Sequence, residues 1–144
     1  MTRMRRQLRL VLALALGAAV TTSVVAPAQA ASAGVLDGDV TNRLSSTYTV
    51  KVATFSGSNL TEKCPATNGT TYSCRTYWLP NGRADDQING RNWDTDALMV
   101  ESPYRVYSWT GTYQNVPAFR WYKISDGDNR TCELTSNTPA CFAY

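Results

Sequence analysis

Two aromatic-rich stretches decide the fold class of this chain: YRVYSW at residues 104–109 and AFRWYKI at residues 118–124. In both stretches the side chains alternate with a period of two, which is typical of β-strands. A break with Gly, Asn and Pro separates them, and Asp126-Gly127 follows the second stretch. Turn residues of this kind end strands. The pattern therefore predicts two neighbouring strands of an antiparallel meander at the floor of the core.

The first 30 residues have the composition of a secretory signal peptide. Four arginines precede an apolar stretch at residues 10–25, and Ala28-Gln29-Ala30 forms a small-x-small cleavage site. The apolar stretch is short and is diluted by Gly17 and Thr21-Thr22-Ser23, so cleavage fits it better than a permanent membrane anchor. We expect cleavage after Ala30 and a freely secreted, extracellular product that is not bound to a membrane.

The basic character of the whole chain comes from this signal segment. The chain has 14 Lys and Arg residues against 11 Asp and Glu residues. Without the four signal arginines, 10 basic residues face 11 acidic ones, and the net charge of the mature part is −1. No cluster of Lys or Arg follows Arg9, which argues against nucleic acid or an anionic membrane as the main partner.

The length of the mature part predicts one domain. Its 114 residues are enough for a single hydrophobic core, although a domain of this size benefits from cross-links. Residues 31–45 are polar and contain Gly and Asp, so we expect a flexible N-terminal segment there. Residues 46–144 then form a single all-β domain.

Four cysteines lie in the mature part: Cys64, Cys74, Cys132 and Cys141. In an exported protein an even number of cysteines indicates disulfides, and three pairings are possible. We favour Cys64 with Cys74 and Cys132 with Cys141, because each pair brackets a loop rich in turn residues. On the chain-entropy model, closing a loop of about ten residues contributes somewhat under ~3 kcal/mol. Zinc is the weaker alternative, since the spacings are not C-x-x-C and histidine is absent.

Three further segments have the pattern of strands. Residues 47–55 and 72–79 alternate apolar and polar side chains, which predicts two strands with one buried face each. Ala97–Val100 is apolar throughout and fits a central strand, whereas the polar residues 84–94 fit a long loop. With about six short strands, the predicted architecture is a small antiparallel barrel or sandwich, all-β and stapled by disulfides.

One segment, residues 104–134, resembles a known family. Arg120-Trp121-Tyr122-Lys123-Ile124, followed by Ser125-Asp126-Gly127, is similar to a strand and turn of bacterial SH3-like domains, which are common in exported, wall-associated proteins. The resemblance implies binding of peptides or of cell-wall material. The chain departs from the family pattern at two points: the N-terminal Leu-Asn-Val-Arg strand is missing, and Cys132 stands where a Gly-Trp-hydrophobic strand is expected.

The absence of histidine restricts the possible chemistry. It excludes a Ser-His-Asp or Cys-His nucleophile system and a His-ligated catalytic metal, and oxidised cysteines leave no thiolate. Asp94 and Asp96, with Asp85-Asp86 nearby, could still supply the two acids that glycoside hydrolysis needs. We favour the alternative that they solvate a loop and cap the strand at Ala97, and we assign no catalytic residue.

Two segments that contain Asp-Gly-Asp could supply oxygen ligands to calcium: Asp37-Gly38-Asp39 and Asp126-Gly127-Asp128-Asn129. Asp85-Asp86 could add to them. Neither segment fits an EF-hand loop, and Asp-Gly between two strands is a strong signal for a hairpin turn. The turn interpretation is therefore favoured, and we assign no metal and no cofactor.

The aromatic content is the main functional signal. Four Trp, eight Tyr and three Phe residues all follow residue 31, more than a core of this size needs, so we expect some at the surface. Both faces of the predicted meander are aromatic, and the face with Tyr107 and Trp121 also carries Arg105 and Lys123. Charged side chains tolerate a partly wet face, which makes this face the predicted ligand surface. The predicted ligand-binding residues are Tyr107, Trp109, Trp121, Trp93 and Tyr77.

These features lead to three candidate functions. The first is a small secreted, non-catalytic binding protein that acts on an extracellular protein, as an inhibitor does, through its exposed aromatic face. The second is a carbohydrate- or cell-wall-binding module, in which Trp and Tyr rings stack on the sugars of a polysaccharide. The third is a carboxylate-dependent hydrolase. We expect a monomer.

Overall fold

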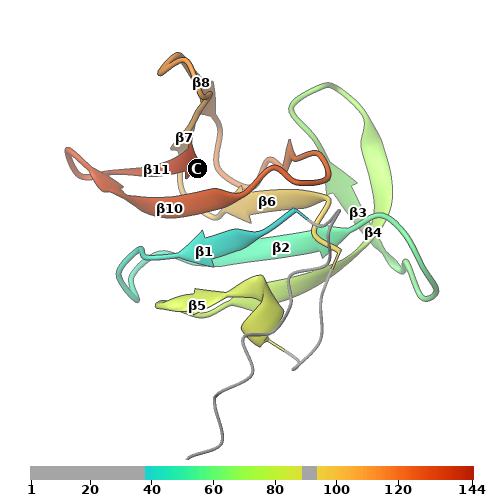
Figure 1. The fold of residues 1–144 in the computed structure, drawn as a ribbon. Helices are drawn as coiled ribbons and strands as arrows, with labels where there is room; N and C mark the ends of the chain where they lie inside the picture. Colours follow the sequence, from blue (N-terminus) through green and yellow to red (C-terminus); the bar gives the residue numbers. More distant parts are fainter. Residues whose placement is uncertain (1–37, 89–93) are drawn as a thin grey trace, which may run out of the picture.

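The computed structural model describes residues 38–88 and 94–144 (Figure 1). They fold into two β-sheets, which confirms the all-β prediction. One sheet has six strands in the order β5-β1-β10-β11-β7-β8, and the other has five in the order β3-β4-β2-β6-β9. The strands are β1 (Val40–Asn42), β2 (Val50–Thr54), β3 (Glu62–Pro65), β4 (Thr71–Leu79), β5 (Arg83–Ala84), β6 (Ala97–Val100), β7 (Tyr104–Tyr107), β8 (Tyr113–Val116), β9 (Tyr122–Lys123), β10 (Arg130–Thr135) and β11 (Thr138–Ala143).

Helical structure is minor in this part of the chain. Strand β5 leads directly into a short 3-10 helix, η1 (Asp85–Gln87), inside the segment that was predicted to be a long loop. Within residues 38–88 and 94–144, no helix has the length and apolar character that a membrane span requires. The signal segment, on which the prediction of export rests, lies outside the described residues.

The core lies between the inner faces of the two sheets. Strand β7 shows how alternation builds it, since Tyr104 and Val106 are buried while Arg105 and Tyr107 point outward. Both sheets contribute to this first core cluster, so each covers the apolar face of the other. Its buried members are Val40, Leu44, Val50, Val52, Leu79, Leu98, Val100, Tyr104, Val106, Val116, Ile124, Cys132 and Cys141.

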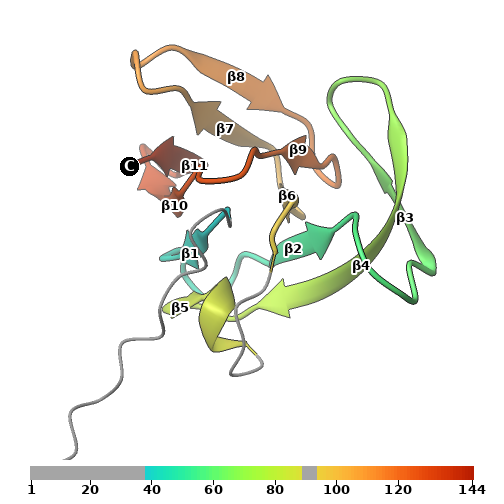
Figure 2. The same ribbon diagram turned by 45° about the vertical axis from the view of Figure 1, so that its right-hand side comes forward.

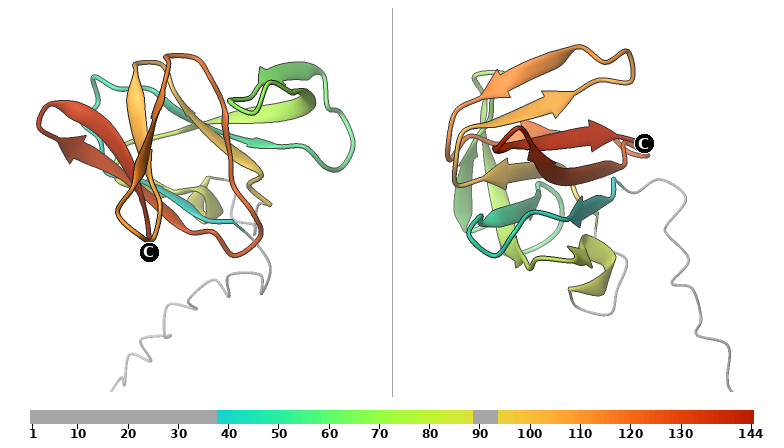
Figure 3. Two further views of the ribbon diagram at one scale, coloured as in Figure 1. Left: turned by 90° about the horizontal axis from the view of Figure 1, so that it is seen from above. Right: turned by 90° about the vertical axis from the view of Figure 1, so that its left-hand side faces the viewer.

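Strand β6 is buried on both faces. Leu98 and Val100 belong to the first core cluster, whereas Ala97 and Met99 belong to a second cluster on the opposite face of the sheet. The prediction of a central strand at Ala97–Val100 is thereby confirmed, with β2 and β9 paired on either side of it. The second cluster includes residues of the β3–β4 hairpin, which extends away from the body of the molecule (Figure 3).

Tyr104 links the two sheets through its hydroxyl group. The side chain comes from β7 in one sheet and is buried. Its hydroxyl lies 2.8 Å from the carbonyl oxygen of Arg120 and 3.3 Å from that of Leu98 in β6 of the other sheet. A tyrosine hydroxyl has one proton to donate, so the two carbonyls share it. Burial raises the pKa of Tyr104, which keeps this donor protonated.

Both disulfides have the predicted local pairing. Cys64–Cys74 closes the β3–β4 hairpin, and Cys132–Cys141 joins residues that lie directly opposite each other in β10 and β11. All four cysteines are fully buried. The first bond lies in the second core cluster and the second bond in the first, so each disulfide fills a core as well as stapling a hairpin.

The predicted pairing of residues 104–109 with residues 118–124 is wrong. The antiparallel partner of β7 is β8, which places Tyr107 opposite Tyr113. Strand β8 lies in the stretch that sequence reasoning treated as a break, because its residues are polar apart from the two at its ends. Gly111, with a φ of 80°, supplies the left-handed conformation that the tight turn between β7 and β8 needs.

Residues 118–124 take a different course from the one predicted. The N–H of Arg120 donates to the carbonyl of Pro117 at 3.3 Å, and Phe119 has a φ of 60°. This left-handed residue interrupts any strand at that point. The remaining strand, β9, pairs with β6 in the five-stranded sheet, so the two aromatic stretches belong to different sheets.

The N-terminal part of the described chain also corrects a prediction. Residues 31–45 were expected to be flexible, yet β1 lies within this range and pairs with β10 in parallel and with β5 antiparallel. Asn42 is buried, and its side-chain amide donates to the carbonyl of Leu79 at 2.8 Å. The flexible assignment is therefore wrong for residues 40–42. A short polar strand can be held in place by strands that are distant in sequence, and its own residues do not reveal that pairing.

We expect Tyr104→Phe to lower the free energy of unfolding by about 1–2 kcal/mol, because it removes a buried hydroxyl donor and keeps the shape of the ring. Urea denaturation at neutral pH measures this difference. Tyr113→Phe removes an exposed hydroxyl from the neighbouring strand and should change the value by less than ~0.5 kcal/mol. Equal stability of the Tyr104 variant and the wild type would contradict the linking role of this hydroxyl.

Candidate functional site

Three aromatic side chains form a row across the outer face of the six-stranded sheet. Phe142 on β11 lies opposite Tyr107 on β7, and Tyr107 lies opposite Tyr113 on β8. The ring centroids are 4.5 Å apart in the first pair and 5.1 Å apart in the second. We call Phe142, Tyr107 and Tyr113 the aromatic row. Cross-strand pairs of this kind stabilise a sheet by roughly 0.2–1 kcal/mol each.

The ring faces of the aromatic row are largely covered. Phe142 stacks on Tyr107 with an interplanar angle of 20°, and Tyr113 meets Tyr107 at 41° from the neighbouring strand on the other side. The guanidinium of Arg105 lies 5.0 Å from the centroid of the Tyr113 ring, within the range of a cation–π interaction. The row therefore offers ring edges and hydroxyl groups to a ligand, and few free, flat ring faces.

The turn between β7 and β8 presents Trp109 to solvent. This hairpin lies at the top of Figure 2, and the Trp109 side chain is 69 % exposed. The turn is held by its own hydrogen bonds: the N–H of Ser108 donates to the carbonyl of Thr112 at 2.8 Å. The Ser108 hydroxyl also lies 2.8 Å from that of Thr110. Trp109 is thus displayed on an ordered turn.

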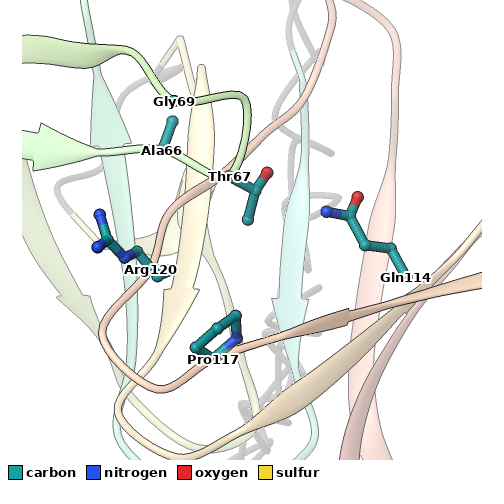
Figure 4. Close-up of a pocket in the computed structure, with 6 residues that line it drawn as sticks. All are labelled: Ala66, Thr67, Gly69, Gln114, Pro117 and Arg120. Carbon is teal, nitrogen blue, oxygen red and sulfur yellow. The ribbon is translucent and has the colours of Figure 1, made fainter.

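A pocket of about 290 Å³ lies between β8 and the turn that joins β3 to β4 (Figure 4). Gln114 of β8 and Thr67 of that turn face each other across it, and Pro117 lies below them in this view. The volume is near the lower end of the range for small-ligand pockets. The lining residues are Ala66, Thr67, Gly69, Gln114, Pro117 and Arg120.

Trp121 does not belong to an exposed ligand surface, and this part of the site prediction is wrong. Its side chain is 4 % exposed and lies in the second core cluster with Met99 and the disulfide Cys64–Cys74. The backbone N–H of Trp121 donates to the carbonyl of Pro65 at 3.1 Å. The cause is the same change of course at Phe119, which sends Trp121 to the far face of β6.

The other predicted ligand residues have separate locations. Tyr107 is the centre of the aromatic row. Trp109 is exposed in the turn that follows, two residues further along the chain. Tyr77 is partly buried against the first core cluster, and Trp93 lies outside the described residues. Of the predicted ligand residues that the structure describes, only Tyr107 and Trp109 therefore lie together in one element, the β7–β8 hairpin.

Three aromatic residues of this region were not among the predicted ligand-binding residues. Tyr113 and Phe142 complete the aromatic row, and Phe119 is 60 % exposed between two residues that line the pocket. A signal for the hairpin was present, since Gly111 is flanked by threonines and followed by a Tyr-x-Asn alternation. No local signal connects Phe142 with Tyr107, because β11 and β7 pair in parallel from distant parts of the chain.

Asp94 and Asp96 are both tied to the residues that follow β2. A carboxylate oxygen of Asp96 accepts from the N–H of Phe55 at 2.6 Å, and one of Asp94 accepts from the hydroxyl of Ser56 at 3.0 Å. Burial raises the pKa of Asp96, while the bond from Phe55 lowers it. Both carboxyl groups hold a turn, which is a structural role of the kind that the loop interpretation predicts.

Three carboxyl groups converge beside β5. One ligand oxygen from each of Asp39, Asp85 and Asp86 lies within 4.8 Å of the others. Asp85 is fully buried and accepts from the hydroxyl of Thr95 at 2.5 Å. Burial, together with the charges of Asp39 and Asp86, raises the pKa of Asp85 to about 7, against the lowering effect of its hydrogen bonds from Thr95 and Val40. Oxygen ligands in this arrangement could hold a hard cation such as Ca²⁺.

The second Asp-Gly-Asp segment is not part of that cluster. Asp128 forms an ion pair with Arg130 at 2.8 Å, and Asp126 is exposed on the turn after β9. Gly127 has a φ of 73° in this turn, in line with the turn interpretation. Asp37 lies outside the described residues.

Comparison of the chain with protein-family models, with curated proteins and with solved structures finds no match. The resemblance of residues 104–134 to bacterial SH3-like domains stays a prediction. The geometry of the β7–β8 hairpin and its surroundings is therefore the basis for a functional proposal.

The raised pKa of Asp85 predicts how stability depends on pH. A carboxyl whose pKa rises from 3.8 to about 7 binds its proton more tightly in the folded than in the unfolded protein. The contribution of Asp85 to the free energy of unfolding therefore falls as the pH rises from about 4 to about 7. Asp85→Asn should flatten this part of the profile in urea denaturation over that pH range. Asp126→Asn, on an exposed turn, is the control, and an unchanged slope in the Asp85 variant would contradict this interpretation.

Proposed function

We propose that this chain is a small, secreted, non-catalytic binding protein that engages an extracellular protein through the β7–β8 hairpin. One observation supports this most: Trp109, in the turn of this hairpin, and Tyr113, at the start of β8, are 69 % and 50 % exposed. Exposed aromatic side chains gathered in one region are typical of interface anchors. The ordered turn around Trp109 limits the entropy that such an anchor loses on binding.

Secretion is part of this proposal. The signal-like first 30 residues support it, and so do two disulfides, which persist in oxidising compartments. The hairpin stapled by Cys132–Cys141 pairs through β11 with β7, so the covalent link stabilises the strand from which the proposed binding element projects. A secreted inhibitor needs such a rigid platform, because rigidity reduces the free energy lost on association.

The covered faces of the aromatic row favour a protein partner over a polysaccharide. Stacking on a sugar requires a free ring face, whereas Tyr107 lies between Phe142 and Tyr113. Ring edges and hydroxyl groups suit the mixed apolar and polar contacts of a protein interface. Trp109 is the exception, since its exposed indole could also stack on a sugar, and a cell-wall polysaccharide is therefore the second candidate.

We expect Trp109→Ala to weaken partner binding by ~2 kcal/mol or more, because a central aromatic anchor contributes at least this much to an interface. The mature chain, immobilised, is used to capture partners from culture fluid and from isolated cell wall, and calorimetry then compares the variants. The melting temperature should change little, since the side chain is exposed.

Trp78→Ala is the matched control for this experiment. Trp78 is 61 % exposed and lies on β4 in the other sheet, so its removal should leave partner binding intact. Equal losses in both variants, or unfolding of the Trp109 variant, would contradict the proposal. Retention on chitin, cellulose or peptidoglycan that depends on Trp109, without capture of a protein, would establish the polysaccharide alternative instead.

A further inference from the structure

Strand β8 has a free edge. Among residues 38–88 and 94–144, it is the last strand of the six-stranded sheet and pairs only with β7. The N–H of Ser108 donates to the carbonyl of Thr112, and bonded pairs alternate along an antiparallel ladder. The N–H and C=O groups of Tyr113 and Asn115 therefore point away from β7. Both residues are exposed, and an edge of this kind is a template for a further strand.

The pocket lies next to this edge. Gln114, between Tyr113 and Asn115, lines the pocket, with Thr67 of the β3–β4 turn on the opposite side. A strand added to β8 would place alternate side chains on the two faces of the sheet. One set would lie toward the pocket, and the other set would lie beside Tyr113 in the aromatic row. The edge and the pocket thus form one continuous docking region for an extended chain.

The charge of this region is one-sided. Residues 102–125 contain Arg105, Arg120 and Lys123 but no Asp or Glu, and residues 64–74 carry no charge. Within the described part of the chain, neither Arg105 nor Arg120 forms an ion pair. The mature part as a whole has a net charge of −1, so this surface is locally positive on a nearly neutral molecule. Charge complementarity calls for an acidic occupant.

We propose that β8 takes an extended, acidic polypeptide segment of the partner protein as an additional strand. The backbone of that segment bonds to the free groups of Tyr113 and Asn115, and its Asp or Glu side chains lie near Arg105 and Arg120. This inference rests on the proposed function and names the class of partner for the same hairpin. Strand addition with side-chain pockets is a common mode of peptide recognition.

A second copy of this chain fits the edge less well. Pairing β8 with itself would place the positively charged region of one copy alongside that of the other. Like charges brought together in an interface oppose association. The arginines of this region favour an acidic segment. The charge of the region therefore favours an acidic partner segment over a second copy of this chain.

The test uses the mature, oxidised protein and a displayed library of random peptides about twelve residues long. Peptides selected at low ionic strength should be enriched in Asp or Glu within an alternating, β-forming pattern. Binding of a selected peptide should slow hydrogen exchange at the amides of Tyr113 and Asn115. Selection of no peptide, of peptides without acidic residues, or of peptides that protect another strand would overturn the inference.

Two pairs of variants complete the test. Asn115→Pro removes an outward N–H from an edge strand, where proline is tolerated, and should weaken the selected peptides about tenfold, ~1.4 kcal/mol. Asn115→Thr keeps the N–H and should bind as the wild type does. The double variant Arg105→Gln and Arg120→Gln should also weaken binding about tenfold. The control is the double variant Arg43→Gln and Arg83→Gln, which removes the same charge at exposed positions and should leave binding unchanged.

The outcome also separates this inference from the proposed function. If Asn115→Pro binds the selected peptides as the wild type does, strand addition is wrong. If Trp109→Ala still abolishes capture of the natural partner in that case, the hairpin remains a protein-binding element that uses its tip and not its edge. If neither Asn115→Pro nor Trp109→Ala weakens binding, the proposed function is contradicted as well.

Discussion

The hydroxyl of Tyr104 connects the fold to the proposed site. It comes from β7 in the six-stranded sheet and bonds to the carbonyls of Arg120 and Leu98, on the side of the five-stranded sheet. A buried hydroxyl needs such partners, so the turn at residues 117–120 is held against the core. Since the chain after this turn enters the other sheet as β9, nothing that follows β8 in sequence covers its edge. The same bond that joins the sheets thus helps to keep the edge of β8 open for the partner segment that we propose.

Burial of β6 on both faces explains the remaining architecture. A small domain gains stability from each additional apolar surface that it buries, and the side of β6 that faces away from the first core is covered by Trp121 and the disulfide Cys64–Cys74. An aromatic side chain that sequence reasoning placed in a ligand surface therefore serves a second core. The aromatic residues of this region are thus divided between core and surface: Tyr104 and Trp121 are buried, whereas Trp109 and Tyr113 are exposed.

Local patterns in the sequence predicted which residues form strands better than they predicted which strands pair with each other. The all-β class, the central strand at Ala97–Val100 and both disulfides followed from alternation, apolar content and loop composition. The pairing of the aromatic stretches did not, because a single left-handed residue, Phe119, redirects the chain. Of the site residues, Tyr107 and Trp109 were predicted from the sequence as aromatic residues at the surface. Phe142 was not predicted, since the parallel pairing between β11 and β7 has no local signature in the sequence.

The central claim is that β8 is an edge strand, bonded to β7 on one side and free on the other. Residue-resolved hydrogen exchange of the free, mature protein tests it most directly. The amide of Gln114 faces β7 and should be protected, whereas the amides of Tyr113 and Asn115 on either side of it should exchange rapidly. Protection of all three amides in the free protein would contradict the claim, because it would mean that the edge is already covered.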